Sequence, residues 1–244
     1  MGVIKQRIAR GLHRSGFVVT RTPGAGTLAR HLREVFSLLD VDCVIDVGAN
    51  RGQFGRMLRD EVGFRGRIAS VEPSPSIFEE LVVVGADDPA WLPFNFGLAD
   101  VDGEAILHTH ESDDFNSLHA LNDYGAKRFD LHEIGTEPIV LHRLDAVFDQ
   151  LAGDCSRVFL KCDTQGHDLS VLAGLGERTI VGLQLELSFI GIYEGAPGYL
   201  EALAEVARLG YTPSGFFPIT RHSDGLALVE ADGVFVAHAN SGRH

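Results

Sequence analysis

The chain has 244 residues, of which 45% are hydrophobic and 23% charged, and its formal net charge at pH 7 is −13. This composition is typical of a folded globular protein and excludes wholesale disorder or a collagen-like structure. No apolar run approaches the roughly 20 residues of a membrane-spanning helix, and the three cysteines are too few for a disulfide framework, which favours a reducing, cytoplasmic setting.

The chain begins with a basic segment, because residues 1–33 contain seven basic side chains and no acidic one. Residues 1–27 are expected to form a short helical arm, which either pairs with acids of the fold or contacts a membrane surface or RNA. Because the whole chain carries −13 and this segment +7, residues 34–244 carry −20. A nucleic-acid partner is therefore disfavoured, since phosphate groups require a basic surface.

From residue 28 onward, apolar residues occur in turn at helical spacing and in short strand-like runs. We expect helices at residues 28–40, 54–59, 77–84, 169–175 and 199–209, and buried strands at 43–47, 68–71, 91–96, 158–162 and 180–187. Strands that alternate with helices indicate a parallel sheet with helices on both faces. Residues 211–219 and 233–238 are expected to close the sheet as an antiparallel pair.

The middle of the chain departs from this alternation. Asp102-Gly103 predicts a hairpin turn that joins the strand at 91–96 to another at 105–110. Residues 111–137 are polar and are expected to form an irregular loop before a strand at 139–144. Loops of this length in compact domains are often functional, so we expect this one to contact a substrate.

A glycine turn follows the first buried strand. Gly48 and Gly52 allow positive φ and close approach of a ligand, and the amides of the following helix point toward that ligand. Gln53 occupies the position of the third glycine of a dinucleotide fingerprint, which disfavours a dinucleotide. Asp46 suits a cationic ligand, and Glu72, at the end of the next strand, can accept both hydroxyls of a ribose. The combination favours a nucleoside that carries a positively charged amino acid, such as S-adenosylmethionine.

Several blocks of the sequence resemble the FkbM family of class I S-adenosylmethionine-dependent methyltransferases. The blocks are residues 44–54, Val71-Glu72-Pro73, residues 97–100, Arg143-Leu144-Asp145, residues 160–167 and Leu185-Glu186-Leu187-Ser188. They occur in the family's order, and the Lys161-x-Asp163-x-Gln165-Gly166 block is the most specific. The resemblance implies an α/β, Rossmann-like class I methyltransferase sheet with seven strands, mostly parallel with an antiparallel last hairpin, in a methyltransferase domain over residues 28–244.

The resemblance also implies S-adenosylmethionine as the cofactor. The residues expected to bind it are Asp46, Gly48, Asn50, Gly52, Gln53, Phe54, Glu72, Pro73, Leu98 and Asp163. Members of the family look like O-methyltransferases of sugar or polyketide hydroxyls. We expect a sugar of a glycoside or glycolipid as the acceptor, because the acidic chain favours a neutral acceptor over an anionic one.

Methyl transfer to an alcohol requires a group that removes the hydroxyl proton or a metal that acidifies it. Asp163 and Glu186 are expected at neighbouring strand ends, where they would bind Mg²⁺ with substrate oxygens completing the shell. Alternatively, one of these acids orients a histidine base. His167, four residues after Asp163, and His119, in the polar loop, are the histidines that we expect near the acceptor.

Two departures from the family's pattern leave other functions open. Gln165 stands where the family often has Glu, and Asn116-Ser117 stands where it often has two serines. A non-catalytic S-adenosylmethionine-binding or scaffold protein is therefore an alternative. A nicotinamide-dependent oxidoreductase is another, which the absent third glycine disfavours. The sequence leaves the oligomeric state open, including a homo-oligomer.

Overall fold

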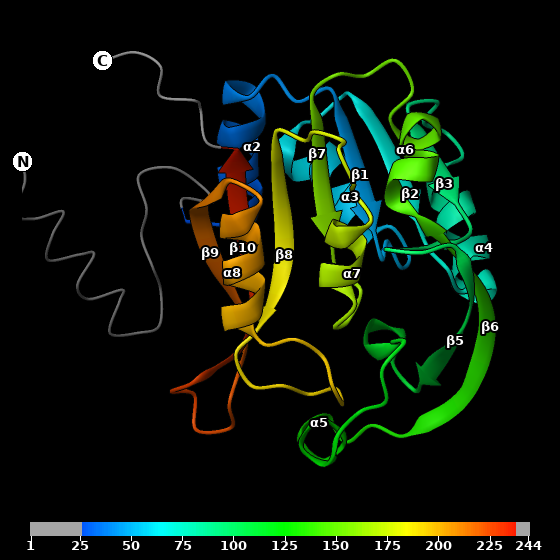
Figure 1. Ribbon diagram of the computed structural model, residues 1–244, viewed down its shortest axis with the longest axis vertical. Coiled ribbons are helices and arrows are strands. Elements are labelled where there is room, and N and C mark those ends of the chain that lie inside the picture. The colour runs from blue at the N-terminus through cyan, green and yellow to red at the C-terminus, as the bar shows by residue number, and fades with distance from the viewer. Residues whose placement is uncertain (1–25, 238–244) are drawn as a thin grey trace, which may run out of the picture.

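The computed structural model describes residues 26–237, and its central feature is a seven-stranded sheet (Figure 1). In spatial order its strands are β3 (Trp91–Phe94), β2 (Arg67–Val71), β1 (Cys43–Val47), β7 (Val158–Cys162), β8 (Gly182–Ser188), β10 (Leu228–Ala237) and β9 (Tyr211–Arg221). The first five are parallel, whereas β10 is antiparallel to both of its neighbours. The predicted sheet, with its antiparallel last hairpin, is confirmed. The predicted arm over residues 1–27 lies outside the described residues, apart from Gly26 and Thr27.

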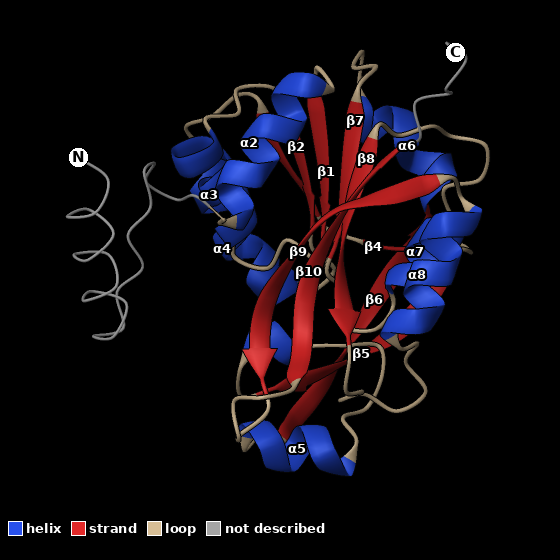
Figure 2. Cartoon of the chain, turned by 90° about the vertical axis from the view of Figure 1, so that its left-hand side faces the viewer, coloured by secondary structure: helices blue, strands red, loops and turns tan. Residues whose placement is uncertain are grey.

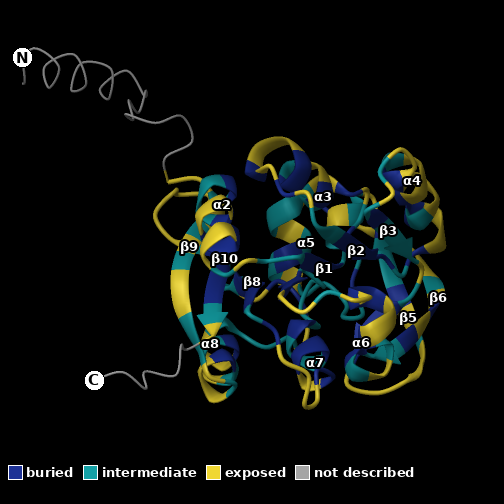
Figure 3. Cartoon of the chain, turned by 90° about the horizontal axis from the view of Figure 1, so that it is seen from above, coloured by how far each residue is buried: buried dark blue, intermediate teal, exposed yellow. Residues whose placement is uncertain are grey.

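Helices cover both faces of this sheet, as Figure 3 shows. One face carries α2 (Leu28–Leu38), α3 (Gln53–Met57) with its π-helical continuation (Leu58–Val62), and α4 (Pro75–Gly85); the other carries α6 (Leu144–Ala152), α7 (Asp168–Ala173) and α8 (Tyr199–Arg208). The central strands are short apolar runs because both of their faces are covered. All five residues of β1 and of β7 are buried.

A second sheet of three strands lies beside the first and corrects the predicted hairpin. It consists of β4 (Gly97–Ala99), β6 (Glu133–Arg143) and β5 (Gly103–His110), in that spatial order. The turn at Asp102-Gly103 therefore does not join paired strands, because β6 lies between β4 and β5. Asp102 accepts a hydrogen bond from the Arg143 amide (3.0 Å) instead of closing a tight hairpin.

The expected irregular loop at residues 111–137 is also wrong in part. It contains a 3₁₀ turn (Asp113–Phe115), the helix α5 (Asp123–Phe129) and the first residues of β6. The side chain of Asn122 begins α5 by accepting a hydrogen bond from the Gly125 amide (2.8 Å). Figure 2 shows α5 below the ends of the strands. Its segment packs on residues 189–196, with backbone hydrogen bonds such as Asn122 N–H to Ile192 O (2.9 Å).

The order of the strands fixes where a ligand can bind. The chain moves from β1 outward to β2 and β3, and later from β7 outward to β8, so the direction reverses between β1 and β7. Ligands of open α/β sheets bind outside the carboxyl ends of the strands at such a reversal. Among residues 26–237, none of the helices combines the length and apolar content that crossing a membrane requires.

Candidate active site

A cavity of about 630 Å³ lies at the carboxyl ends of the parallel strands. Its lining combines the turn after β1, the ends of β2, β7 and β8, part of β10, and apolar side chains of the small sheet such as Leu107 and Leu141. This volume falls within the range typical of small-molecule sites. The cavity therefore occupies the place that the strand order predicts.

The glycine turn forms the part of the cavity next to β1. Gly48 has φ +71° and Gly52 has φ +76°, as predicted for both positions. A Cβ atom on Gly48 would lie 1.8 Å from the carbonyl oxygen of Asp163, so only glycine allows the ends of β1 and β7 to approach this closely. Asn50 is also left-handed, with φ +47°, and α3 begins at Gln53. The turn thus presents backbone atoms to the cavity.

Glu72 follows β2 and is fixed against the glycine turn. One carboxylate oxygen accepts a hydrogen bond from the Asn50 amide (2.8 Å) and the other from the Ser74 amide (2.9 Å). Burial raises the pKa of Glu72 to about 7, against the lowering effect of these two amides. Leu98 and Ile77 line the cavity beside it. A fixed carboxyl next to an apolar wall suits a ribose and its attached base.

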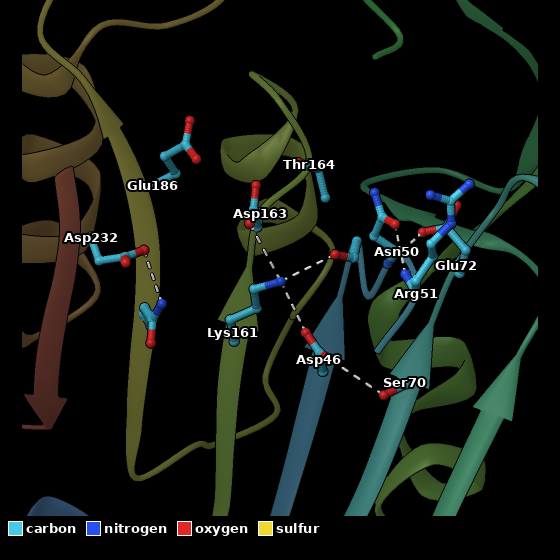
Figure 4. Close-up of polar contacts among 12 residues, drawn as sticks. Asp46, Asn50, Arg51, Ser70, Glu72, Lys161, Asp163, Thr164, Glu186 and Asp232 are labelled. Carbon is cyan, nitrogen blue, oxygen red and sulfur yellow. Dashed lines mark hydrogen bonds and ion pairs between the residues drawn. The ribbon is translucent and has the colours of Figure 1, made fainter. Parts of the chain in front are cut away.

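A buried ion pair lies beneath the turn (Figure 4). The Asp46 carboxylate is fully buried, lies 3.0 Å from Lys161 Nζ and accepts a hydrogen bond from the Ser70 hydroxyl (3.3 Å). Lys161 also donates to the carbonyl oxygen of Gly48 (3.1 Å). Although burial lowers the pKa of Lys161, the charges of Asp46 and Asp163 raise it above the ordinary value, so the ammonium stays protonated. Asp46 therefore fixes the lysine that holds the turn and does not itself line the cavity.

The side chain of Gln165 connects the two acids that the sequence predicts to be catalytic. Its Nε2 donates to Asp163 Oδ1 (2.9 Å) and to Glu186 Oε2 (3.5 Å), and its Oε1 accepts from the Tyr193 hydroxyl (2.8 Å). Both acids line the cavity. Burial, and next the charge of Asp163, raise the pKa of Glu186 well above its ordinary value. A glutamate at position 165 would add a third acid here, whereas the amide supplies hydrogen-bond donors.

His167 is the predicted histidine that lines the cavity. It precedes α7, and its Nε2 has no hydrogen-bond partner within the described part of the chain. Burial, and to a smaller extent His119, lower the pKa of His167, so its imidazole is neutral at pH 7. The two rings lie 6.1 Å apart between centroids. His119 itself is not part of the cavity lining.

Most of the residues predicted to bind the cofactor lie together. Those that line the cavity are Gly48, Asn50, Gln53, Phe54, Glu72, Pro73, Leu98 and Asp163. Asp46 lies beneath the turn, and Gly52 faces Trp91 and Leu81 in the core, where a Cβ atom would be 3.0 Å from the indole. These two residues therefore stabilise the turn from the side of the core and do not face the cavity.

Sequence reasoning misses several polar residues of the lining, among them Lys161, Gln184, Glu230 and Asp232. A signal exists for these four, because each lies within an otherwise apolar strand. On β8 Gln184 precedes Glu186 by two residues, and on β10 Glu230 precedes Asp232 by two residues. Residues two apart on a strand point to the same face. A polar pair inside a buried strand is therefore a sign of a polar cavity.

The predicted magnesium site has two candidate protein ligands, Asp163 and Glu186. Over residues 26–237, no group of three or more His, Cys, Asp or Glu side chains is arranged to hold a metal ion. Magnesium sites often use only one or two carboxylates together with substrate and water oxygens. The metal thus stays a prediction that depends on the substrate.

Comparison with known proteins places this site in a family. The family model described as the methyltransferase FkbM domain matches residues 46–213, whereas no curated protein matches the chain. Among solved structures, the FkbM methyltransferase of Methylobacillus flagellatus KT has 17% identity and a TM-score of 0.50, covering 80% of this chain and 44% of that one. Aeropyrum pernix fibrillarin with bound S-adenosylmethionine has 13% identity and a TM-score of 0.46, covering 80% and 66%. A Streptococcus thermophilus rRNA methylase has 9% identity and a TM-score of 0.47, covering 90% and 99%.

The chain spans less than half the length of the Methylobacillus protein, and at this identity the likeness shows a shared fold. The family model is the stronger finding, because it matches well over half of the chain and includes the glycine turn, Glu72, Lys161, Asp163 and Glu186. The chain belongs to the FkbM methyltransferase family.

Proposed function

We propose that the chain is an S-adenosylmethionine-dependent O-methyltransferase that acts in the cytoplasm on a hydroxyl of a small molecule, a sugar of a glycoside or glycolipid. One observation carries the proposal: a single cavity brings the glycine turn and Glu72 together with Asp163 and an unpartnered imidazole at His167. The proposed nucleoside site and the proposed proton acceptor thus face the same cavity.

The residues present fit S-adenosylmethionine. Glu72 offers acceptor oxygens to the ribose hydroxyls, Leu98 and Ile77 offer an apolar surface to the adenine, and the glycine turn offers backbone atoms to the amino-acid portion. When bound, this cofactor supplies an electrophilic methyl group on a sulfonium. Seven acidic residues line the cavity against one lysine among the described residues, which favours a positively charged cofactor and disfavours an anionic acceptor.

His167 is the group best placed to remove the hydroxyl proton. Its lowered pKa leaves the imidazole neutral, and Nε2 has no other hydrogen-bond partner among the described residues. Asp163, held by Gln165, can accept a hydrogen bond from the acceptor and orient it. If Asp163 and Glu186 bind Mg²⁺ instead, activity will disappear with EDTA and return with added Mg²⁺; activity that is indifferent to EDTA supports the histidine base.

Calorimetric titration with S-adenosylmethionine tests the cofactor assignment. Glu72→Ala should weaken binding by at least about tenfold, because the expected acceptor for the ribose hydroxyls is lost. Glu79→Ala, on the exposed face of α4, is the matched control and should bind as the unchanged chain does. Equal affinity in all three proteins, or binding of NAD in place of S-adenosylmethionine, would overturn the assignment. Cofactor binding without transfer of a labelled methyl group would support a non-catalytic binding protein.

A further inference from the structure

One side of the cavity carries a group of acceptor side chains that the proposed function does not use in full. We name Gln184 and Glu186 of β8 together with Glu230 and Asp232 of β10 the acidic wall; all four line the cavity. In the register of the two strands Asp232 is directly opposite Glu186. Burial, with a smaller contribution from the charge of Asp232, raises the pKa of Glu186 well above its ordinary value, so these two carboxyls are not ionised together.

Gln184 points independently to a ligand. The residue is 3% exposed, and its Nε2 donates to Asp232 Oδ1 (2.9 Å), which leaves Oε1 as the free end of the amide. Oε1 is buried and has no hydrogen-bond partner in the part of the chain that the structure describes. A buried acceptor without a donor costs free energy unless a ligand supplies the donor. Glu230 already shares hydrogen bonds with Thr220 and Glu186, so the unmet need for a donor lies at Gln184 Oε1.

No ion pair within the described residues neutralises the acidic wall, although the charge of Arg128 acts on Glu230 and that of Lys161 acts on Asp232 from a greater distance. Within residues 26–237, no lysine, arginine or histidine lies within ion-pair distance of Glu186, Glu230 or Asp232. Lys161, the fixed positive charge of the lining, is held by Asp46 and Asp163. Burial raises the pKa of Asp232 to about 6 and raises that of Glu230 as well. Ionised carboxyls here are thus unfavourable until a cation approaches them.

A cation that donates hydrogen bonds fits the separate acceptors of the acidic wall. The described residues include no group of three or more His, Cys, Asp or Glu side chains arranged to hold a metal. A protonated amine instead has several N–H donors, which can reach separate acceptors such as Asp232, Glu230 and Gln184 Oε1. Charge-assisted hydrogen bonds of this kind are stronger than neutral ones.

We propose that the acidic wall binds a protonated amino group of the acceptor, so that the substrates are amine-bearing molecules such as amino sugars. The inference rests on the proposed function and names its substrate class. Glu186 and Asp232 lie on the opposite side of Lys161 from Glu72 (Figure 4). The strand β10 is four strand positions from β2, roughly 19 Å at the usual spacing. The acidic wall is therefore remote from the ribose end of the cofactor site.

Calorimetry on the full chain saturated with S-adenosylhomocysteine tests this inference without relying on turnover. The probes are the methyl glycosides of glucosamine and galactosamine, their N-acetyl derivatives, and the methyl glycosides of glucose and galactose. An amino sugar should bind about tenfold or more tightly than its N-acetyl and hydroxyl counterparts. Asp232→Asn and Glu230→Gln should each abolish most of this preference. Glu104→Gln, an exposed acid outside the cavity, is the matched control and should retain it.

The outcomes separate the inference from the proposed function. If S-adenosylhomocysteine does not bind, the proposed function fails and the inference fails with it. If it binds but neither amino sugar is preferred over its N-acetyl derivative, the inference alone is overturned. Two further results overturn it. The first is that Asp232→Asn weakens the binding of S-adenosylhomocysteine but not that of methylthioadenosine, which lacks the amino-acid portion. The second is that Mg²⁺ binds with an affinity that depends on Asp232 and Glu230.

Discussion

Lys161 and Asp46 are opposite charges buried inside the sheet, 3.0 Å apart. Such a pair adds little net stability, but removal of one partner leaves an uncompensated buried charge. Lys161→Met should therefore lower the free energy of unfolding by about 3 to 5 kcal/mol. It should also release the Gly48 carbonyl and weaken cofactor binding. Urea denaturation followed by circular dichroism measures the first effect, and calorimetry measures the second.

Two further variants show whether the buried charge causes the loss. Lys161→Met combined with Asp46→Asn removes both charges and should recover much of the stability. Arg178→Met breaks an exposed ion pair with Asp149 and should change stability far less, because solvent screens that pair. A double variant as unstable as the single one would show that the lost packing of the lysine stem, and not the charge of Asp46, is responsible.

Asp232 makes the free energy of unfolding depend on pH. Burial raises its pKa from 3.8 to about 6, so the folded protein binds this proton more tightly than the unfolded chain. Stability from this group therefore falls as pH rises from about 4 to about 6 and stays low above that range. Asp232→Asn should gain about 3 kcal/mol relative to the unchanged chain at pH 7 and little at pH 3.8.

Urea denaturation of both proteins across this pH range checks the prediction, because groups common to both cancel in the difference. A constant difference at all pH values would mean that the pKa of Asp232 is not raised. The same experiment supports the test of the acidic wall, since a variant that is more stable at pH 7 has not lost ligand binding by unfolding.

At the scale of elements, the turn from β1 into α3 depends on the close approach of two strand ends. Gly48→Ala places a Cβ atom where the Asp163 carbonyl oxygen lies and also forces alanine to a positive φ. We expect loss of detectable S-adenosylmethionine binding and a lower free energy of unfolding. Gly225→Ala has a similar φ, +72°, but open space around its Cβ, and should cost only about 1 to 2 kcal/mol without changing binding. Unchanged binding by Gly48→Ala would show that the turn does not form the cofactor site.

Some of the strands can be predicted from the sequence and others cannot. The strands β1, β2, β7 and β8 are apolar runs bounded by turns, and local pattern is enough to place them. The small sheet is different, because Leu141 of β6 pairs with both Gly97 of β4 and Gly103 of β5. A residue shared by two partners far away in the sequence leaves no local signal. The outer half of β6 is polar and exposed, so alternation does not mark its start.

The residues of the candidate site likewise fall into those whose roles could be predicted from the sequence and those whose roles could not. Gly48 and Glu72 could be predicted, because their roles follow from the strand and turn in which each one lies. The role of Asp46 could not, since it depends on the register that places Lys161 opposite it. Likewise Asp232 belongs to the site only because β10 pairs antiparallel with β8. Chemistry that depends on one element is visible in the sequence, and chemistry that depends on pairing between distant elements is not.

At the scale of the whole molecule, charge argues for a small acceptor. Residues 34–244 carry −20, and the cavity lining described by the structure holds seven acids and one lysine. A polyanion such as RNA is repelled by such a surface. With labelled S-adenosylmethionine and a cell extract, the label should therefore enter the small-molecule or lipid fraction and not the RNA fraction.

A variant that lacks the proposed general base, His167, makes this labelling experiment quantitative. His167→Gln removes the proton acceptor but keeps a polar side chain of similar reach, and should lower the rate of labelling by about 10²-fold or more. His119→Gln is the matched control, because it changes a neighbouring histidine that does not line the cavity, and should retain most of the activity. The unchanged protein should lose activity below pH 6.5 as His167 becomes protonated, since burial places its pKa below the ordinary value. Label that appears in RNA and is released by ribonuclease would contradict the small-molecule acceptor, and equal rates for both variants would remove His167 as the base.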